Sequence, residues 1–102
     1  MPQRRGHQGK RDANHREFRD LWRKLGGSWF DTAALPGELD GVASAFGETC
    51  RVEVWSKDKR KLTPDEAKTC REWNGWIVHW KTEDDVLRTR SEMLVKAGGL
   101  DN

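Results

Sequence analysis

The chain lacks the features that would place it in a membrane or a secretory pathway. No stretch approaches the roughly 18 to 20 consecutive apolar residues that a membrane span needs. The charged N-terminus is not followed by an apolar segment, so no signal peptide is visible. Cysteine is scarce: Cys50 and Cys70 show no CxxC or Cys/His pattern, which argues against a disulfide framework or a zinc site and favours buried thiols. We therefore expect a cytoplasmic protein.

Length and composition limit the architecture. A chain of 102 residues fits one domain and excludes a two-domain enzyme. It is 34% hydrophobic and 35% charged, which allows a small core beneath a heavily charged surface. Six Trp and three Phe make a fully disordered chain unlikely, and we expect Trp22 and Trp29 in the core. We expect one domain over residues 12–96, a flexible basic arm over residues 1–11 and a flexible tail over residues 97–102.

Charge is distributed unevenly, although the net charge is only +2. An acidic centre over residues 30–50 has no Lys or Arg and separates two basic flanks. These flanks could bind the phosphates of a nucleic acid, giving salt-sensitive binding with little sequence information, although charge runs more often serve solubility. The basic residues concerned are Arg4, Arg5, Lys10 and Arg11 in the arm and Lys57, Lys59, Arg60 and Lys61 in the second flank.

The spacing of apolar residues predicts the elements in the order αβββαβα. A stripe beginning at Phe18 predicts a helix that opens near Asp12 or Asn14 and is stopped by Gly26-Gly27. Strands are expected over residues 28–32, 39–46, 49–55 and 76–80. Helices are expected from a capping box at Thr63-Pro64 to Gly75, and after an N-cap at Thr82. The apolar face of the last helix is expected to contain Val86, Leu87, Met93 and Leu94. This order predicts an α/β domain with a small mixed sheet flanked by helices on both sides.

Two carboxylates are candidates for a divalent-metal site. Asp40 opens one predicted strand and Glu53 lies inside the next, where alternation points it away from the neighbouring valines and onto the face of Trp55. Two carboxylates with water suit Mg²⁺ or Mn²⁺. Spacing leaves an alternative open, in which Glu53 is solvated and pairs with Arg51 or Lys57.

Four short motifs, in this order, resemble those of small phage and bacterial VRR-NUC proteins, of the PD-(D/E)XK nuclease superfamily. They are Arg11-Asp12-Ala13-Asn14-His15-Arg16-Glu17, Gly37-Glu38-Leu39-Asp40-Gly41-Val42, Val52-Glu53-Val54-Trp55 and Lys61-Leu62-Thr63-Pro64-Asp65-Glu66. The resemblance covers about residues 11 to 88 and implies a restriction endonuclease-like fold.

The same resemblance implies metal-dependent cleavage of phosphodiester bonds, often in branched or flap DNA, and a homodimer. Asp40 matches the metal-binding Asp, Glu53 matches the acid of the E-x-K motif, and Glu17 matches an acid on the first helix. The carbonyl of Val54 would be a further metal ligand. A domain this small also buries too little DNA alone to cut two strands, so a dimer is expected on size as well.

Three positions depart from the pattern of the family. Leu39 stands for the Pro before the Asp, Glu66 for a Gln in the second helix, and Trp55 for the Lys of E-x-K. Glu66 is explained by the capping box, but an indole N–H cannot supply the positive charge of a lysine. Lys57 is the simplest replacement, because positions 53, 55 and 57 share a face if the strand continues that far.

The loss of the motif lysine leaves two functions open. The first is a metal-dependent endonuclease that uses Asp40, Glu53 and Lys57. The alternative is a nuclease fold that no longer hydrolyses and binds nucleic acid or a host or phage protein, for example as an inhibitor of host defence. In that alternative, Trp55 would be an exposed interface anchor.

Overall fold

The computed structural model describes residues 15–55 and 61–98 and contains one four-stranded sheet with three helices in this part of the chain. A first helix, described over residues 15–24, precedes β1 (Ser28–Asp31), β2 (Gly41–Ala45), β3 (Glu48–Val54), α2 (Pro64–Glu72), β4 (Ile77–Trp80) and α3 (Glu83–Lys96). The predicted order αβββαβα and the mixed α/β class are confirmed.

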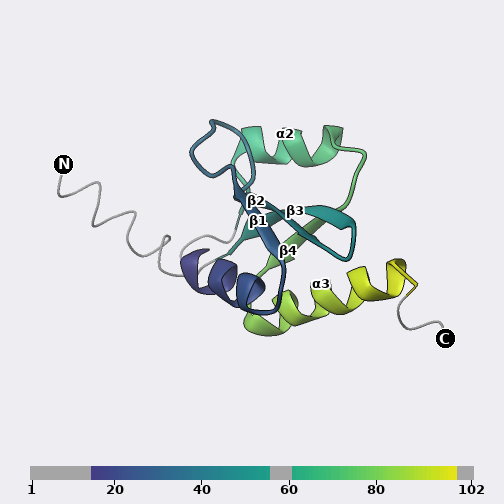
Figure 1. Ribbon diagram of the computed structural model, residues 1–102. Helices are drawn as coiled ribbons and strands as arrows, with labels where there is room; N and C mark the ends of the chain where they lie inside the picture. The colour runs from purple at the N-terminus through teal and green to yellow at the C-terminus, as the bar shows by residue number, and fades with distance from the viewer. Residues whose placement is uncertain (1–14, 56–60, 99–102) are drawn as a thin grey trace.

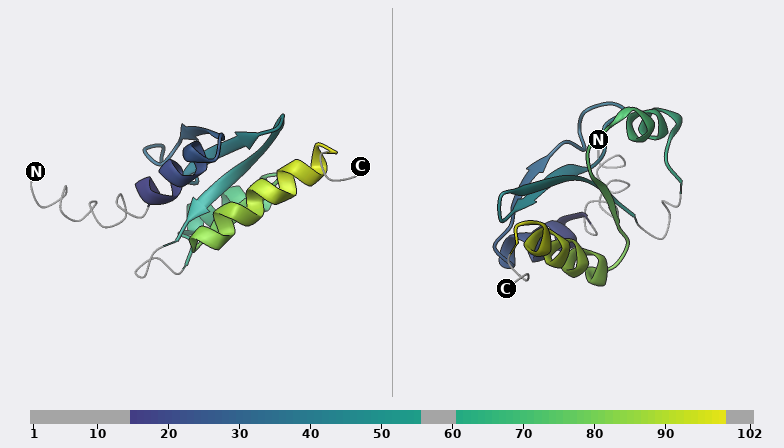
Figure 2. Two further views of the ribbon diagram at one scale, coloured as in Figure 1. Left: turned by 60° about the horizontal axis from the view of Figure 1, so that its bottom comes forward. Right: turned by 90° about the vertical axis from the view of Figure 1, so that its right-hand side faces the viewer.

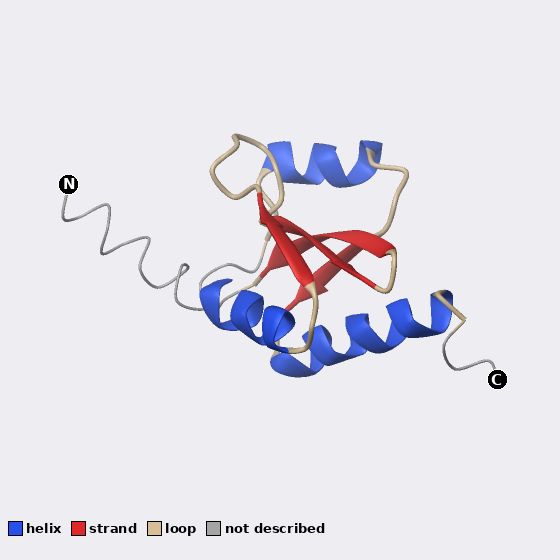
Figure 3. Ribbon diagram, in the orientation of Figure 1, coloured by secondary structure: helices blue, strands red, loops and turns tan. Residues whose placement is uncertain are grey.

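The sheet has the strand order β1-β2-β3-β4. β2 runs antiparallel to both β1 and β3, and β4 runs parallel to β3. In Figure 3 the four strands form one twisted layer. The second strand begins at Gly41, so Asp40 directly precedes it rather than opening it as predicted. This places Asp40 at the point where the chain enters the sheet.

Helices cover both faces of the sheet, as the sequence predicted. In Figures 1 and 2, α2 lies on one side, while the first helix and α3 lie on the other. The main core lies between the sheet and one pair of helices, the first helix and α3. Alternate residues of β3 point to opposite faces of the sheet, so only every second residue of β3 contributes to this core. Its buried members are Phe18, Trp22, Ala43, Cys50, Val52, Val54, Trp80, Val86 and Met93.

Tryptophans form the centre of this core. Trp22 and Trp80 are fully buried, with ring centroids 5.5 Å apart, and half-buried Trp29 stacks on Trp80 at 5.6 Å. The indole N–H groups of Trp22 and Trp80 donate to the Ser28 carbonyl at 2.8 Å and to the Thr89 hydroxyl at 3.0 Å. The predicted burial of Trp22 is therefore confirmed, with both buried donors satisfied.

Helix ends follow the predicted signals in most places. Thr63 and Glu66 form the capping box of α2 with Pro64 in its first turn, and Gly26 leaves the first helix with φ of 97°. Gly75 does not end α2, which stops at Glu72 with Trp73 as its C-cap. The helix thus ends before the glycine, where Trp73 already has an extended backbone.

Two expectations about apolar side chains need correction. Cys50 is buried as predicted, but Cys70 is only half-buried, and both thiols are free. On α3, Val86 and Met93 face the core, whereas Leu87 is 44% exposed and lies off this face. Within the described residues, no helix has the length and apolar character needed to cross a membrane.

Candidate active site beside β2 and β3

Asp40 is fixed to β3 by two hydrogen bonds. Its backbone N–H donates to the Val52 carbonyl at 2.9 Å, and its carboxylate Oδ2 accepts from the Val54 N–H at 2.7 Å. Only 4% of the residue is exposed. Asp40 is thereby held against the segment of β3 that contains Glu53.

The glycine after Asp40 allows this close approach. A Cβ atom on Gly41 would lie 2.1 Å from the ring of Trp29, which is too close for any side chain. Gly41 also lies opposite Val52 in the antiparallel register, so it begins the pairing directly after Asp40. Glycine at position 41 is therefore required by the packing of Trp29 of β1 on β2.

Glu53 is fully buried in β3, on the opposite face from Val52 and Val54. Burial raises the pKa of the Cys70 thiol, and the charge of Glu53 raises this pKa further, which indicates that Glu53 faces α2. A fully buried carboxylate is costly unless its charge is compensated. The predicted direction of Glu53, away from the core valines, is confirmed.

Arg51 shares this face and has its own acidic contact. It forms an ion pair with Glu38, and its guanidinium lies 4.6 Å from the ring centroid of Trp73. One of the two predicted alternatives paired Arg51 with Glu53, whereas the ion pair observed for Arg51 is with Glu38. The loop before β2 is thereby tied to β3 close to the acidic pair.

The donors around Asp40 and Glu53 are chemically suited to a hard divalent cation. Two carboxylates and the backbone carbonyl of Val54 are all oxygen donors, of the type that Mg²⁺ and Mn²⁺ prefer. Among the residues that the structure describes, no group of three or more His, Cys, Asp or Glu could hold a metal ion. The set would therefore rely on the carbonyl and on water beyond its two acids.

The first helix brings His15, a residue that sequence reasoning did not select, to Asp40. Glu17 is exposed, whereas His15 is buried and its Nδ1 lies 4.0 Å from Oδ1 of Asp40. The other ring nitrogen lies 3.7 Å from Oδ1 of Asp31, and the ring meets Trp29 edge-on. The spacing of His15 to Phe18 and Trp22 places it on the buried stripe of the helix, a signal that the sequence contained.

Trp55 lies beside His79 of β4 and Lys81, which directly follows β4, and sequence reasoning selected neither. Its ring centroid is 5.5 Å from that of His79 and 5.7 Å from Nζ of Lys81. Burial, and then the charge of Lys81, lower the pKa of His79, which favours the neutral imidazole. Since β3 and β4 are distant in sequence, only their parallel register brings Lys81 to this site.

Several predicted residues lie outside the described part of the chain. Arg4, Arg5, Lys10 and Arg11 of the basic arm are among them, as are Lys57, Lys59 and Arg60 of the second basic flank. Lys61, the last residue of that flank, is described and exposed. Glu66 has the capping role predicted for it: its carboxylate accepts from the Thr63 N–H at 2.9 Å.

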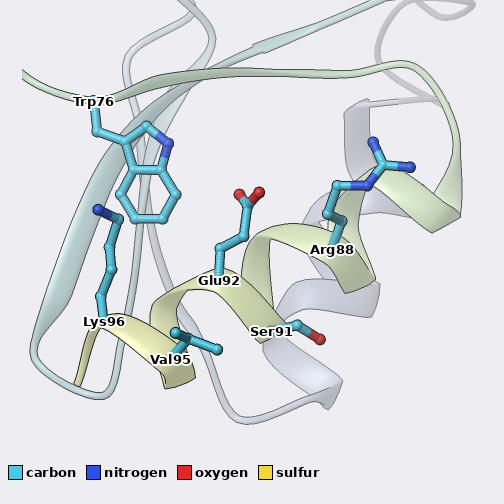
Figure 4. A pocket seen from close by; sticks show the side chains of 6 residues that line it. All are labelled: Trp76, Arg88, Ser91, Glu92, Val95 and Lys96. Carbon is cyan, nitrogen blue, oxygen red and sulfur yellow. The ribbon is translucent and has the colours of Figure 1, made fainter. Parts of the chain in front are cut away.

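A surface pocket of about 470 Å³ lies elsewhere, between α3 and the start of β4. Figure 4 shows Trp76 facing Lys96 and Glu92 across it, with Arg88, Ser91 and Val95 along α3. None of these residues belongs to the candidate site. The ammonium of Lys96 lies 5.0 Å from the Trp76 ring centroid, a contact similar to that of Lys81 with Trp55.

Comparison with protein-family models, with curated proteins and with solved structures found no match to this chain.

Proposed function

We propose that this chain is a divalent-metal-dependent DNA endonuclease of the phage VRR-NUC kind, with a restriction endonuclease-like fold. The observation that carries the proposal is the bond from the Val54 N–H to the carboxylate of Asp40. It holds the carboxylate of Asp40 against the residue that directly follows Glu53 in the chain. The mixed sheet with helices on both faces supports the same proposal.

In this proposal Asp40, Glu53 and the carbonyl of Val54 hold Mg²⁺ or Mn²⁺. The bound ion would offset charge on the phosphate and promote ionisation of the attacking water. The residues of the chain provide the rigid part of the site: β3 fixes Glu53, and the two hydrogen bonds of Asp40 fix its carboxylate before any ligand binds. Such preorganisation avoids rearrangement during the reaction.

The proposed substrate is DNA, including flap and branched DNA, and the proposed assembly is a homodimer. The basic flanks around the acidic centre would neutralise phosphates on either side of the acids. Glu17 and Lys57 keep the roles that the resemblance and the strand periodicity give them, as predictions. A dimer would supply the contact area that a domain of 102 residues lacks alone.

Trp55 favours a second candidate, a nuclease fold without hydrolysis that binds nucleic acid or a host or phage protein. The indole occupies the position of the motif lysine and packs beside His79 rather than supplying a charge. A half-buried aromatic of this kind is a common anchor of interfaces. The two candidates differ in one observable, which is whether the purified protein cuts DNA.

The test is cleavage of labelled duplex, flap and four-way-junction DNA with Mg²⁺ or Mn²⁺. Wild type is compared with Asp40→Asn, Glu53→Gln and the control Asp65→Asn, which changes an exposed acid in the first turn of α2. We expect cleavage by wild type and the control only. If all four proteins cut alike, the activity is a contaminant, and if none cuts, the proposal of hydrolysis is wrong and DNA binding in EDTA tests the second candidate.

A further inference from the structure

We infer that Lys81 supplies the positive charge that Trp55 cannot, by binding a DNA phosphate beside the proposed metal ligands Asp40 and Glu53. This inference rests on the proposed function and extends it by naming a residue and its contact. The ammonium of Lys81 would donate hydrogen bonds to a non-bridging phosphate oxygen and keep its proton. It would stabilise charge that develops on the phosphate during hydrolysis.

The register of the sheet carries the inference. Val54 lies opposite Trp80 and Glu53 opposite His79 in the parallel pairing of β3 with β4. The bond from the Trp55 N–H to the Trp80 carbonyl, at 2.9 Å, continues this pairing by one residue, so Lys81, directly after β4, is the neighbour of Trp55, directly after β3. Neighbours in a parallel pair point to the same face.

Side-chain contacts agree with this placement. Nζ of Lys81 lies 5.7 Å from the ring centroid of Trp55, so the amine reaches over the position where the family has its lysine. The same charge acts on His79, which lies opposite Glu53. The lysine is thus displaced to the neighbouring chain segment, while its charge stays on the face of Glu53.

The backbone of Lys81 is fixed, while its side chain is exposed. Its N–H donates to the Asp85 carboxylate at 2.7 Å, and that carboxylate also accepts from the Thr82 N–H in the capping box of α3. A fixed backbone limits the positions of the amine, and an exposed side chain can meet a phosphate. The anchored backbone therefore positions the Lys81 amine better than an unanchored loop would.

The first arm of the test measures binding without metal. Affinity for labelled duplex DNA is measured in EDTA over a range of salt concentrations for wild type, Lys81→Gln and Lys96→Gln. Loss of one phosphate contact should reduce the salt slope by about 0.9. Lys96→Gln is the matched control, because Lys96 also lies over a tryptophan, at the far pocket, and should keep the slope of wild type. An unchanged slope in Lys81→Gln would overturn the inference.

The second arm measures cleavage with Mg²⁺ for the same proteins, Lys57→Gln and the double variant Trp55→Lys/Lys81→Gln. We expect kcat to fall about 100-fold or more in Lys81→Gln, as for loss of one charge-stabilising donor, and to recover in the double variant. Loss in Lys57→Gln with no loss in Lys81→Gln would overturn the catalytic part. If no protein cuts, the proposed nuclease function fails, and the salt slope still decides whether Lys81 binds phosphate.

Discussion

Asp40 has two roles in this account, and two substitutions separate them. Asp40→Ala removes both the carboxylate charge and the acceptor for the Val54 N–H, which lies 2.7 Å from Oδ2. Asp40→Asn removes the charge but keeps a side-chain oxygen that can accept this bond. Both variants relieve any repulsion with Glu53 equally, so the difference in their stability isolates the hydrogen bond.

The magnitude follows from the burial of the partner. An orphaned buried donor costs about 1–3 kcal/mol, so Asp40→Ala should be less stable than Asp40→Asn by that amount. For a domain of this size, each kcal/mol shifts Tm by about 4–8 °C. Urea unfolding followed by tryptophan fluorescence measures the difference, since Trp22 and Trp80 lie in the core. Equal stability of the two variants would refute the claim that Asp40 is held by β3.

Three further predictions concern the surroundings of the site. Gly41→Ala should destabilise the fold by about 1–3 kcal/mol through overpacking against Trp29, measured by urea unfolding; wild-type stability would contradict this. In the native protein a thiol reagent should label half-buried Cys70 before Cys50, because burial raises the pKa of Cys50 to about 12; equal labelling rates would refute it. The lowered pKa of His79 means that the unfolded chain takes up its proton first as pH falls below 6.5, so stability should decrease there. His79→Asn should weaken this dependence in urea unfolding at several pH values, and an unchanged dependence would show that other groups cause it.

Local signals predicted most of the fold. The capping box at Thr63 and Glu66 appears as expected, because its hydrogen bonds involve residues within one turn. Alternation along β3 correctly separated Glu53 from the core valines, since a strand with one apolar face has a fixed register. The exact start of β2 was harder to predict from the sequence. At Asp40 the side-chain carboxylate, and not a backbone carbonyl, accepts the hydrogen bond from the Val54 N–H of β3, so the regular pairing begins one residue later.

The composition of the site depended on contacts that sequence spacing does not encode. Lys81 reaches Trp55 only through the parallel pairing of β3 with β4, whose connection contains α2. His15 meets Asp40 through the packing of the first helix on the sheet. Its place on the apolar stripe was visible in the sequence, but its acidic neighbours were not.

The most direct measurement for the central claim is titration of the protein with Mn²⁺, followed by electron paramagnetic resonance. If Asp40 and Glu53 together hold a divalent cation, wild type should bind Mn²⁺ and Mg²⁺ should compete for it. Asp40→Asn and Glu53→Gln should each weaken this binding, while Asp65→Asn should not. Binding that is absent in wild type, or equal in all four proteins, would contradict a metal site at these two acids.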